Sequence, residues 1–305
     1  MRQVLIVHYS QTGQLDRLAQ SVCGPLQQHA DIQLDYLQLQ PAQPYPFPWP
    51  FLDFFRIFPE TVLMRPQPLL PLAVDASKRY DLVILAYQVW FLSPSQPMTA
   101  FLASPEAAQL LKGTPVVTLI GCRNMWLMAQ EKLKARLTEL GARLVDNIAL
   151  TDACGTAASF LATPLWLFTG RQKPYGWVPR AGIDEAEIAA ASRFGQAMAQ
   201  RLTADSLPIE RPMLSGLGAV RIDEKLIASE KVGNRSFQLW SRLLAALGPQ
   251  QSRRRAVGLV LYIVFLLCLI VTVVPLSALL KKLLAPLLKE RTQREKAYFA
   301  GPSGE

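Results

Sequence analysis

The first forty residues change from an apolar run to a polar turn and then to an amphipathic helical pattern. Residues 4–9 read VLIVHY, and a run so rich in branched residues predicts a buried strand of a parallel sheet. The next apolar residues recur at the spacing of a helix with one buried face: Leu15, Leu18, Ala19 and Val22. Residues 32–37 alternate apolar and polar side chains, which predicts an edge strand.

Predicted strands and predicted helices continue to alternate through the first two thirds of the chain. Apolar runs at 81–86 (DLVILA) and 115–120 (PVVTLI) predict two central strands, and residues 145–150 predict a fifth strand. Helical patterns cover about 126–140 and about 185–202. The alternation predicts an α/β fold with a doubly wound parallel five-stranded sheet in the order 2-1-3-4-5. In such sheets, ligands bind at the carboxyl ends of the strands near the switch point.

Residues 256–274 (AVGLVLYIVFLLCLIVTVV) form the longest apolar stretch and carry no charge. A helix of this length spans roughly 28 Å, enough for the hydrocarbon core of a bilayer. Beyond Pro275, leucines and lysines alternate at the spacing of an amphipathic helix that lies on a membrane surface. Two arrangements fit this pattern: a single span with an interfacial tail, or a re-entrant segment that kinks at Pro275.

The positive charge of the chain is concentrated in its last quarter. Residues 1–224 carry 19 Lys and Arg against 19 Asp and Glu, whereas residues 225–305 carry 13 against 4 and account for the net charge of +9. Because these basic residues flank lipid-like sequence, they favour an anionic membrane surface over nucleic acid as partner. Both flanks of the apolar stretch are basic, so their charge does not choose its orientation.

The cysteines and histidines exclude a conventional metal site. Four cysteines and two histidines show no metal-ligand spacing, and no secretory signal precedes the first strand. We therefore expect no metal, and a globular part on the cytoplasmic face of the inner membrane. The expected organisation is a domain over 1–202 with insertions at about 41–75 and 151–184, a basic amphipathic connector over 203–255, a membrane segment over 256–274, and an interfacial helix and tail over 275–305.

The turn after the first strand has the composition of a phosphate site. It reads SQTG and leads directly into the helical pattern, so backbone N–H groups, two hydroxyls and the positive end of a helix converge. This turn resembles the phosphate loop of flavodoxin-like proteins, which holds the phosphate of FMN. The resemblance implies FMN contacts from Ser10, Gln11, Thr12, Gly13, Gln14 and Leu15. Leu15 departs from the usual threonine, and a turn without a ligand is the alternative. The patterns of dinucleotide-binding and NTP-binding loops are absent.

Two more loops of the predicted sheet resemble the loops that contact the flavin ring in this family. Residues 87–94 (YQVWFLSP) follow the third strand, and the resemblance implies ring contacts from Val89, Trp90 and Phe91. Residues 121–126 (GCRNMW) follow the fourth strand and supply Gly121, Cys122, Asn124 and Met125. Ordinary core packing is the alternative for the aromatic pair. No residue stands out as a catalytic acid or base, and His8 is interpreted as a core histidine.

Two stretches do not belong to a minimal version of this fold. Residues 41–71 include PYPFPWPFLDFFRIFPE, whose prolines disfavour regular structure and whose aromatic residues are too apolar for an ordinary loop. This stretch packs over the domain as a lid, rests on a membrane, or only fills space. Residues 151–184 include SFLATPLWLFTG, which suits either the lining of an alkyl pocket or contact with lipid.

Across most of its length the chain resembles a narrower group, the flavodoxin-like proteins known as dialkylresorcinol condensing enzymes. The resemblance lies in HYSQTGQLDRLAQSV, PYPFPWPF, AYQVWFLSPSQPM, IGCRNMWLMAQEKLK and the basic hydrophobic tail. It implies a lipophilic small-molecule substrate, with membrane lipids and a ketosynthase as partners, and it leaves a homodimer open. Condensation needs a reactive cysteine with histidine partners, which this chain lacks. FMN-dependent oxidation of a dialkylcyclohexanedione to a dialkylresorcinol fits better.

Two alternatives remain at the level of sequence. The same loops suit an NAD(P)H-dependent quinone reductase, whose substrates also partition into membranes. A non-catalytic scaffold that docks a ketosynthase at the membrane would need neither the phosphate turn nor a flavin.

Overall fold

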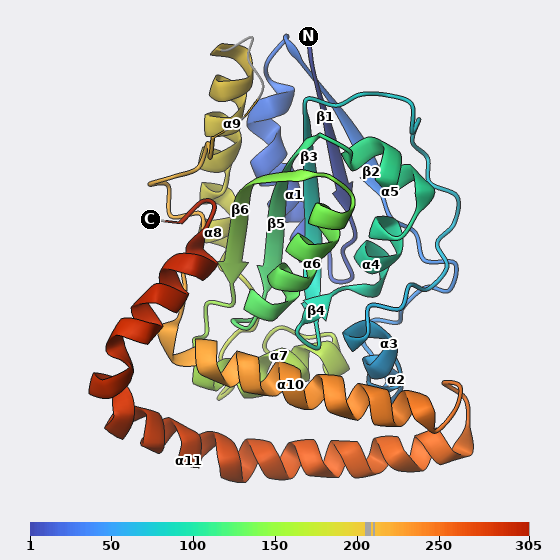
Figure 1. Ribbon diagram of the computed structural model, residues 1–305, viewed down its shortest axis with the longest axis vertical. Coiled ribbons are helices and arrows are strands. Elements are labelled where there is room, and N and C mark those ends of the chain that lie inside the picture. Colours follow the sequence, from blue (N-terminus) through green and yellow to red (C-terminus); the bar gives the residue numbers. More distant parts are fainter. Residues whose placement is uncertain (205–208, 210, 305) are drawn as a thin grey trace.

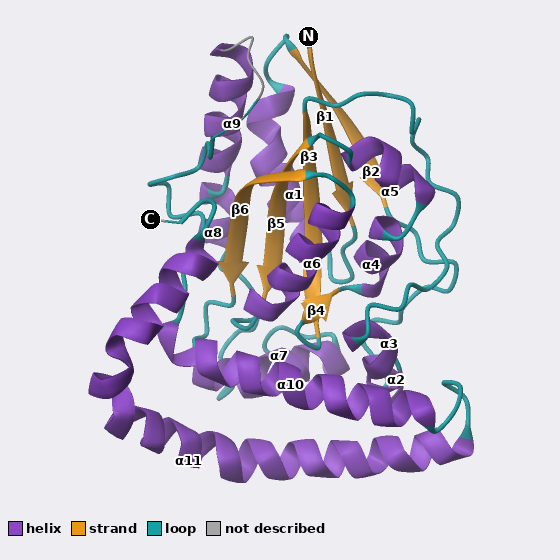
Figure 2. Ribbon diagram, viewed as in Figure 1, coloured by secondary structure: helices purple, strands orange, loops and turns teal. Residues whose placement is uncertain are grey.

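The computed structural model describes residues 1–204, 209 and 211–304; the side chains of residues 156–157 and 273–288 lie outside that description. A twisted sheet forms the centre, and helices cover both of its faces (Figure 1). The carboxyl ends of the strands point toward two long C-terminal helices that cross beneath this edge (Figure 2).

Five strands of the sheet are parallel, and they lie in the order that the sequence pattern predicts. They are β1 (Arg2–His8), β2 (Ile32–Gln38), β3 (Leu82–Trp90), β5 (Pro115–Cys122) and β6 (Arg143–Thr151). Their order is β2-β1-β3-β5-β6, which is the flavodoxin-type arrangement 2-1-3-4-5 when only parallel strands are counted. The prediction of five strands misses β4 (Ser93–Pro94), a short sixth strand that pairs antiparallel with the end of β3.

The end of β3 corrects the prediction that residues 87–90 belong to a loop. These residues continue the strand, and Phe91 and Leu92 alone connect it to β4. Both connecting residues have positive φ angles, 50° and 56°, in a region that costs an L-residue roughly 1–2 kcal/mol. A two-residue hairpin turn of this hand normally uses Asn-Gly. Here the packing of both side chains holds the turn instead, since Leu92 is only 7% exposed.

Each face of the sheet is closed by its own set of helices. The helices α1 (Gln14–Gln27), α8 (Glu185–Ala190) and α9 (Ser192–Ala204) cover one face, and α4 (Gln96–Leu102), α5 (Pro105–Leu111) and α6 (Leu127–Glu139) cover the other (Figure 1). The helix predicted over 185–202 is therefore two helices, which meet at Ala191. Helices α1 and α9 approach so closely that a Cβ on Gly195 would lie 1.9 Å from the carbonyl oxygen of Val22.

Both insertions pack against the domain at the carboxyl edge of the sheet. The first contains α2 (Phe51–Arg56) and α3 (Phe58–Val62), and the second contains α7 (Thr156–Thr169). The backbone N–H of Trp49 donates to the carbonyl of Leu167 at 2.9 Å, which joins the two insertions. Rings from both also meet, with centroids 5.1 Å apart for Phe51 and Phe168.

The C-terminal part forms two long helices, α10 (Glu224–Ala246) and α11 (Arg253–Ala300). Within the described residues, one helical segment, Arg253–Thr272, is long and apolar enough to cross a membrane by length and composition. The leucine and lysine side chains on which the amphipathic prediction after Pro275 depends lie outside the described residues.

Residues that precede α10 and residues that follow α11 in the sequence both form hydrogen bonds with the edge strand β6. The carboxylate of Asp146, which is fully buried, accepts from the backbone N–H groups of Met213 and Leu214 at 2.7 and 3.2 Å. The same carboxylate accepts from the Ser303 hydroxyl at 2.8 Å, near the C-terminal end of the chain. The N–H of Ala149 donates to the carbonyl of Ala219 at 2.9 Å. The connector and the tail thus line the outer edge of the sheet.

Candidate functional site

The turn between β1 and α1 presents polar groups at the point where the strand order reverses. Gly13 precedes α1 with φ 74° and ψ −9°, a left-handed conformation that glycine adopts without strain, and a Cβ there would meet open space. The Thr12 hydroxyl accepts from the N–H of Gln14 at 3.4 Å. The hydroxyl of Ser10 is buried and has no hydrogen-bond partner among the described residues. A buried donor without a partner is costly unless a ligand uses it.

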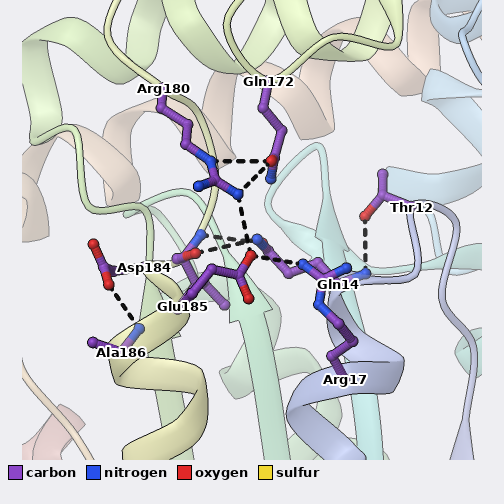
Figure 3. Close-up of polar contacts among 9 residues, drawn as sticks. Thr12, Gln14, Arg17, Gln172, Arg180, Asp184, Glu185 and Ala186 are labelled. Atoms are coloured by element: carbon purple, nitrogen blue, oxygen red, sulfur yellow. Dashed lines mark hydrogen bonds and ion pairs between the residues drawn. The ribbon is translucent and has the colours of Figure 1, made fainter.

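Figure 3 shows how the side chain of Gln14 fixes this turn to the segment after α7. Its amide oxygen accepts from the N–H of Ile183 at 3.1 Å, and its amide nitrogen donates to the carbonyl of the same residue at 3.3 Å. The backbone of Gly182 makes room for this contact, because a Cβ there would lie 2.7 Å from the Gln14 amide nitrogen. Gln11 donates to the carbonyl of Pro46 at 2.9 Å, so the first insertion also touches the turn.

Leu15, the position where the sequence departs from the usual threonine, is buried in the core between α1 and the sheet. It therefore offers the turn no polar group. Two arginines lie beside the turn instead (Figure 3). Arg17 and Arg180 each contact the carboxylate of Glu185, at 3.0 and 3.2 Å. All three side chains are about half exposed, so this network adds positive charge near the turn without desolvating it.

The predicted flavin-stacking residue Trp90 lies inside an aromatic cluster. Rings of Tyr9, Tyr45 and Trp49 surround it edge-on, with centroids 5.1–6.1 Å away. Trp90 is 7% exposed, so neither face of its indole is open. Phe91 packs on Phe54 of the first insertion, 4.5 Å between centroids. The first insertion therefore covers the aromatic loop, in agreement with the lid alternative of the sequence analysis.

Polar atoms without partners gather around this cluster. Within the part of the chain that the structure describes, three buried atoms form no hydrogen bond: the indole nitrogen of Trp49, the amide oxygen of Gln88 and the hydroxyl of Ser95. Gln88 and Ser95 lie side by side, since the N–H of Ser95 donates to the carbonyl of Gln88 at 2.8 Å. Together with the Ser10 hydroxyl, they leave both donors and acceptors unused at the carboxyl ends of β1 and β3. A polar ligand that entered here would find partners already in place.

The second predicted loop, residues 121–126, lies partly in β5 and partly in the turn that follows it. Gly121 and Cys122 end β5, and a Cβ on Gly121 would lie 3.2 Å from a methyl group of Leu15. Gly121 thus serves the packing of α1 on the sheet. Burial raises the pKa of the Cys122 thiol far above its usual range, which makes this cysteine a poor nucleophile. In the turn itself, Asn124 takes part in an interaction, and the sulfur of Met125 accepts from Arg123 at 3.2 Å.

A second constellation of ionisable groups lies near this turn. The guanidinium of Arg123 stacks on the ring of Phe160, 4.1 Å from its centroid, and burial lowers its pKa. The carboxyl group of Glu230 on α10 is fully buried. One oxygen accepts from the N–H of Met128 at 2.7 Å, and the other has no hydrogen bond to any described residue. Burial raises the pKa of Glu230 to about 8, although its hydrogen bonds and Arg123 act in the opposite direction.

Tyr87 belongs to a buried hydrogen-bonded chain across the sheet. Its hydroxyl donates to Gln130 at 2.7 Å, Gln130 donates to Thr118 at 2.9 Å, and Thr118 donates to Asn147 at 2.8 Å. Burial raises the pKa of Tyr87 well above its usual value, so it stays protonated. His8, expected to be a core histidine, contacts the carboxylate of Asp16 at 2.9 Å.

Sequence reasoning missed Glu230 entirely. Its neighbours in the sequence are those of an amphipathic surface helix, and nothing local marks this carboxylate as buried. A weak signal is its position, because it falls at the spacing of the apolar residues Leu226 and Ile227.

The phosphate end of FMN fits these residues, whereas the ring end meets a covered aromatic face. Ser10, Thr12 and the backbone N–H groups at the start of α1 offer donors to a dianion. A planar ring beside Trp90 requires the first insertion to move away from that residue.

No protein-family model matches the sequence, and no curated protein matches it. Among solved structures, the chain is similar to a flavoprotein from Lactobacillus acidophilus NCFM in complex with FMN, with 14% identity and a TM-score of 0.37 over 48% of this chain and 92% of that one. It is similar to a flavodoxin from the domain Archaea, with 10% identity and a TM-score of 0.37 over 66% and 99% of the two chains. It is also similar to the Trp repressor binding protein from Bacillus subtilis, with 17% identity and a TM-score of 0.30 over 63% and 99%.

Two of these three solved structures are a flavoprotein and a flavodoxin by name. With identities and TM-scores this low, the fold assignment rests on the strand order of the sheet itself.

Proposed function

We propose that this chain is an FMN-dependent oxidoreductase. The observation that carries the proposal is the buried, unpartnered hydroxyl of Ser10 in a glycine turn at the N-terminus of α1, at the switch point between β1 and β3. Doubly wound sheets bind their ligands at this point, and helix N-termini bind phosphate. The departure at buried Leu15 removes one hydroxyl from the family pattern and leaves the backbone donors intact.

Each group of the site would have a distinct role. Ser10, Thr12 and the backbone N–H groups of the turn would hold the phosphate, while Gln14 fixes the turn against Ile183. Bound FMN would supply the capacity to accept or donate two electrons. The aromatic residues of the first insertion would exclude water from the ring and its substrate.

The substrate that we propose is lipophilic, namely a dialkylcyclohexanedione that loses two electrons and two protons to become a dialkylresorcinol. Its alkyl chains suit the two insertions, whose exposed apolar side chains Phe51, Leu52 and Leu161 lie at the same edge of the sheet. Condensation is disfavoured as the reaction, because burial raises the pKa of Cys23, Cys122 and Cys154 and leaves none of these thiols activated. Attachment to the cytoplasmic face of a membrane and a ketosynthase partner that delivers the dione complete the proposal.

The first experiment is an absorbance spectrum of the detergent-purified chain with and without added FMN. We expect flavin absorbance that survives gel filtration. A chain that retains no flavin and takes up none on titration would refute the proposal and favour the scaffold. Rapid reduction by NAD(P)H, with turnover on quinones and none on the dione, would select the quinone reductase instead.

Substitution of Ser10→Ala tests the observation itself. The hydroxyl has no partner among the described residues, so its removal should leave folding intact and weaken FMN binding about ten- to a hundredfold, since a hydrogen bond to a charged group is worth roughly 1.5–3 kcal/mol. Ser77→Ala, in an exposed turn far along the chain, is the matched control. Equal FMN affinity of Ser10→Ala and the parent chain would remove Ser10 from the site.

A further inference from the structure

The first half of α11 has two apolar faces, and only one of them is covered by the protein. Gly258, Leu259, Tyr262 and Ile263 are buried against α3 and α10. Tyr262 stacks on Phe58 of α3, with ring centroids 4.3 Å apart. These contacts repeat every three or four residues, as the buried stripe of a surface helix does.

The opposite face of this segment is apolar as well. Every exposed residue between 256 and 271 is apolar, and several are at least half exposed: Val257, Val260, Leu261, Val264, Leu267 and Val271. Leu243 and Leu247 of α10 extend this surface at the hairpin between the two helices. A helix that faced water would carry polar side chains here. We call these residues the α11 apolar face.

Both ends of α11 contact the same globular domain. At its start, Arg255 forms a two-point ion pair with Glu60 of α3, and the two side chains are 4% and 13% exposed. At its other end, Phe299 lies in the core beside the sheet and Ser303 reaches Asp146. Figure 1 shows the helix passing beneath α10 and then bending back to β6.

These contacts disfavour the single span, one of the two arrangements that the sequence left open. A helix that crossed a bilayer would place its ends on opposite sides of a hydrocarbon core about 30 Å thick. Both ends are held by one domain, so a single crossing would break either the Arg255–Glu60 pair or the Ser303–Asp146 contact.

The charged residues that border the α11 apolar face indicate what covers it. Arg253 and Arg254 are exposed just before it, and Arg235 and Arg242 are exposed on α10. Residues 225–305 also hold the whole net charge of +9. A continuous apolar face bordered by arginines matches one leaflet of an anionic bilayer, where the arginines reach headgroups.

We infer that α11 lies flat in one leaflet of an anionic membrane, with its Val257–Val271 face buried in lipid and both ends on the same side. Helix α2 lies beside the start of this face, since the Arg255 guanidinium also donates to the carbonyl of Arg56. Phe51 and Leu52 of α2 are nearly half exposed, so the lipid-facing surface continues onto the insertion that covers the aromatic cluster. A lipophilic substrate would reach the site from the same leaflet.

The α11 apolar face, and not the flavin, would bind the membrane. Membrane binding can therefore be tested independently of cofactor binding. The full chain is mixed with vesicles of phosphatidylcholine alone, or of phosphatidylcholine and phosphatidylglycerol in equal parts, and bound protein is recovered by flotation. We expect binding to the anionic vesicles, weakened about tenfold by Val260→Glu combined with Val264→Glu. Tyr36→Glu, on the remote edge strand β2, is the matched control and should bind as the parent does. No binding, or equal binding by the double variant, would overturn the inference.

A depth profile distinguishes a flat helix from a crossing one. Nitroxide labels at cysteines replacing Val257, Val264 and Val271, which share one face, are compared in a Cys154→Ala, Cys268→Ala background. A flat helix places the three labels at nearly equal depth. A crossing helix separates the first and last by roughly 21 Å along the membrane normal, and that gradient would refute the inference. A flat profile in a chain that binds no flavin would leave this inference standing and refute only the proposed function.

Discussion

Replacing Glu230 by glutamine should make the protein more stable at neutral pH. The carboxyl group is fully buried, and burial raises its pKa from an ordinary value of 4.5 to about 8. Between these two values the folded chain keeps a proton that the unfolded chain releases. Its contribution to stability is therefore complete below pH 4.5 and is lost as the pH rises toward 8.

The size of the effect follows from the pKa values. One pKa unit corresponds to about 1.4 kcal/mol, so the group costs about 3 kcal/mol at pH 7 and about 5 kcal/mol above pH 8. A glutamine side chain would remain neutral at every pH, and its amide oxygen could still accept from the N–H of Met128, which now donates to Glu230 at 2.7 Å. The Glu230→Gln variant should thus match the parent near pH 4.5 and exceed its stability by about 3 kcal/mol at pH 7.

Guanidinium unfolding in detergent, followed by tryptophan fluorescence at a series of pH values, measures this difference. Glu290→Gln is the matched control, because the Glu290 side chain is 90% exposed and its loss should change the pH profile little. A constant difference between the Glu230 variant and the parent across pH 5 to pH 8 would show that the buried carboxyl is already ionised in the folded chain, so that its pKa is not raised. A variant less stable than the parent at pH 7 would refute the reasoning outright.

Further substitutions test the packing that positions the site. Gly195→Ala should destabilise the fold by about 3 kcal/mol, because the added Cβ meets the carbonyl of Val22 at 1.9 Å, whereas Gly24→Ala in open space should be neutral or stabilising in thermal unfolding. Glu60→Gln should cost about 3 kcal/mol in denaturant unfolding, because it leaves Arg255 charged, 4% exposed and without its carboxylate; an unchanged midpoint would count against that pair. FMN titration should quench tryptophan fluorescence as the first insertion leaves Trp90, and a constant signal with bound flavin would place the ring elsewhere.

The hydrophobic pattern was sufficient to predict the parallel sheet because each buried strand is a continuous apolar run. It could not predict the β3–β4 hairpin. The turn residues Phe91 and Leu92 have none of the Asn or Gly signals of such a turn, and only their tertiary packing holds them at positive φ. The turn at Ser10 was found from sequence because its chemistry is local. The cover over Trp90 was one of three alternatives for the first insertion, because the rings of Tyr45 and Trp49 that provide it lie far from Trp90 in the chain.

Glu230 and the return of the tail were hidden for a related reason. A carboxylate on an amphipathic helix gives no local sign of burial, and the partner of Ser303 lies 157 residues earlier in the chain. Contacts of this separation follow from how the elements pack and leave no periodicity in the sequence. The apolar stretch at 256–274 was recognised, but the contacts that hold the two ends of α11 on the domain join residues far apart in the chain.

The attachments along β6 also occupy backbone groups at one edge of the sheet. The edge strand of a sheet normally exposes a row of unpaired backbone N–H and C=O groups, with which a strand of a second molecule can pair. Here the N–H of Asn147 is taken by the Ser303 hydroxyl at 2.5 Å and that of Ala149 by the Ala219 carbonyl at 2.9 Å. Removal of the last few residues would free the N–H of Asn147 and leave that of Ala149 paired, and the shortened protein should aggregate more readily through strand pairing at this edge.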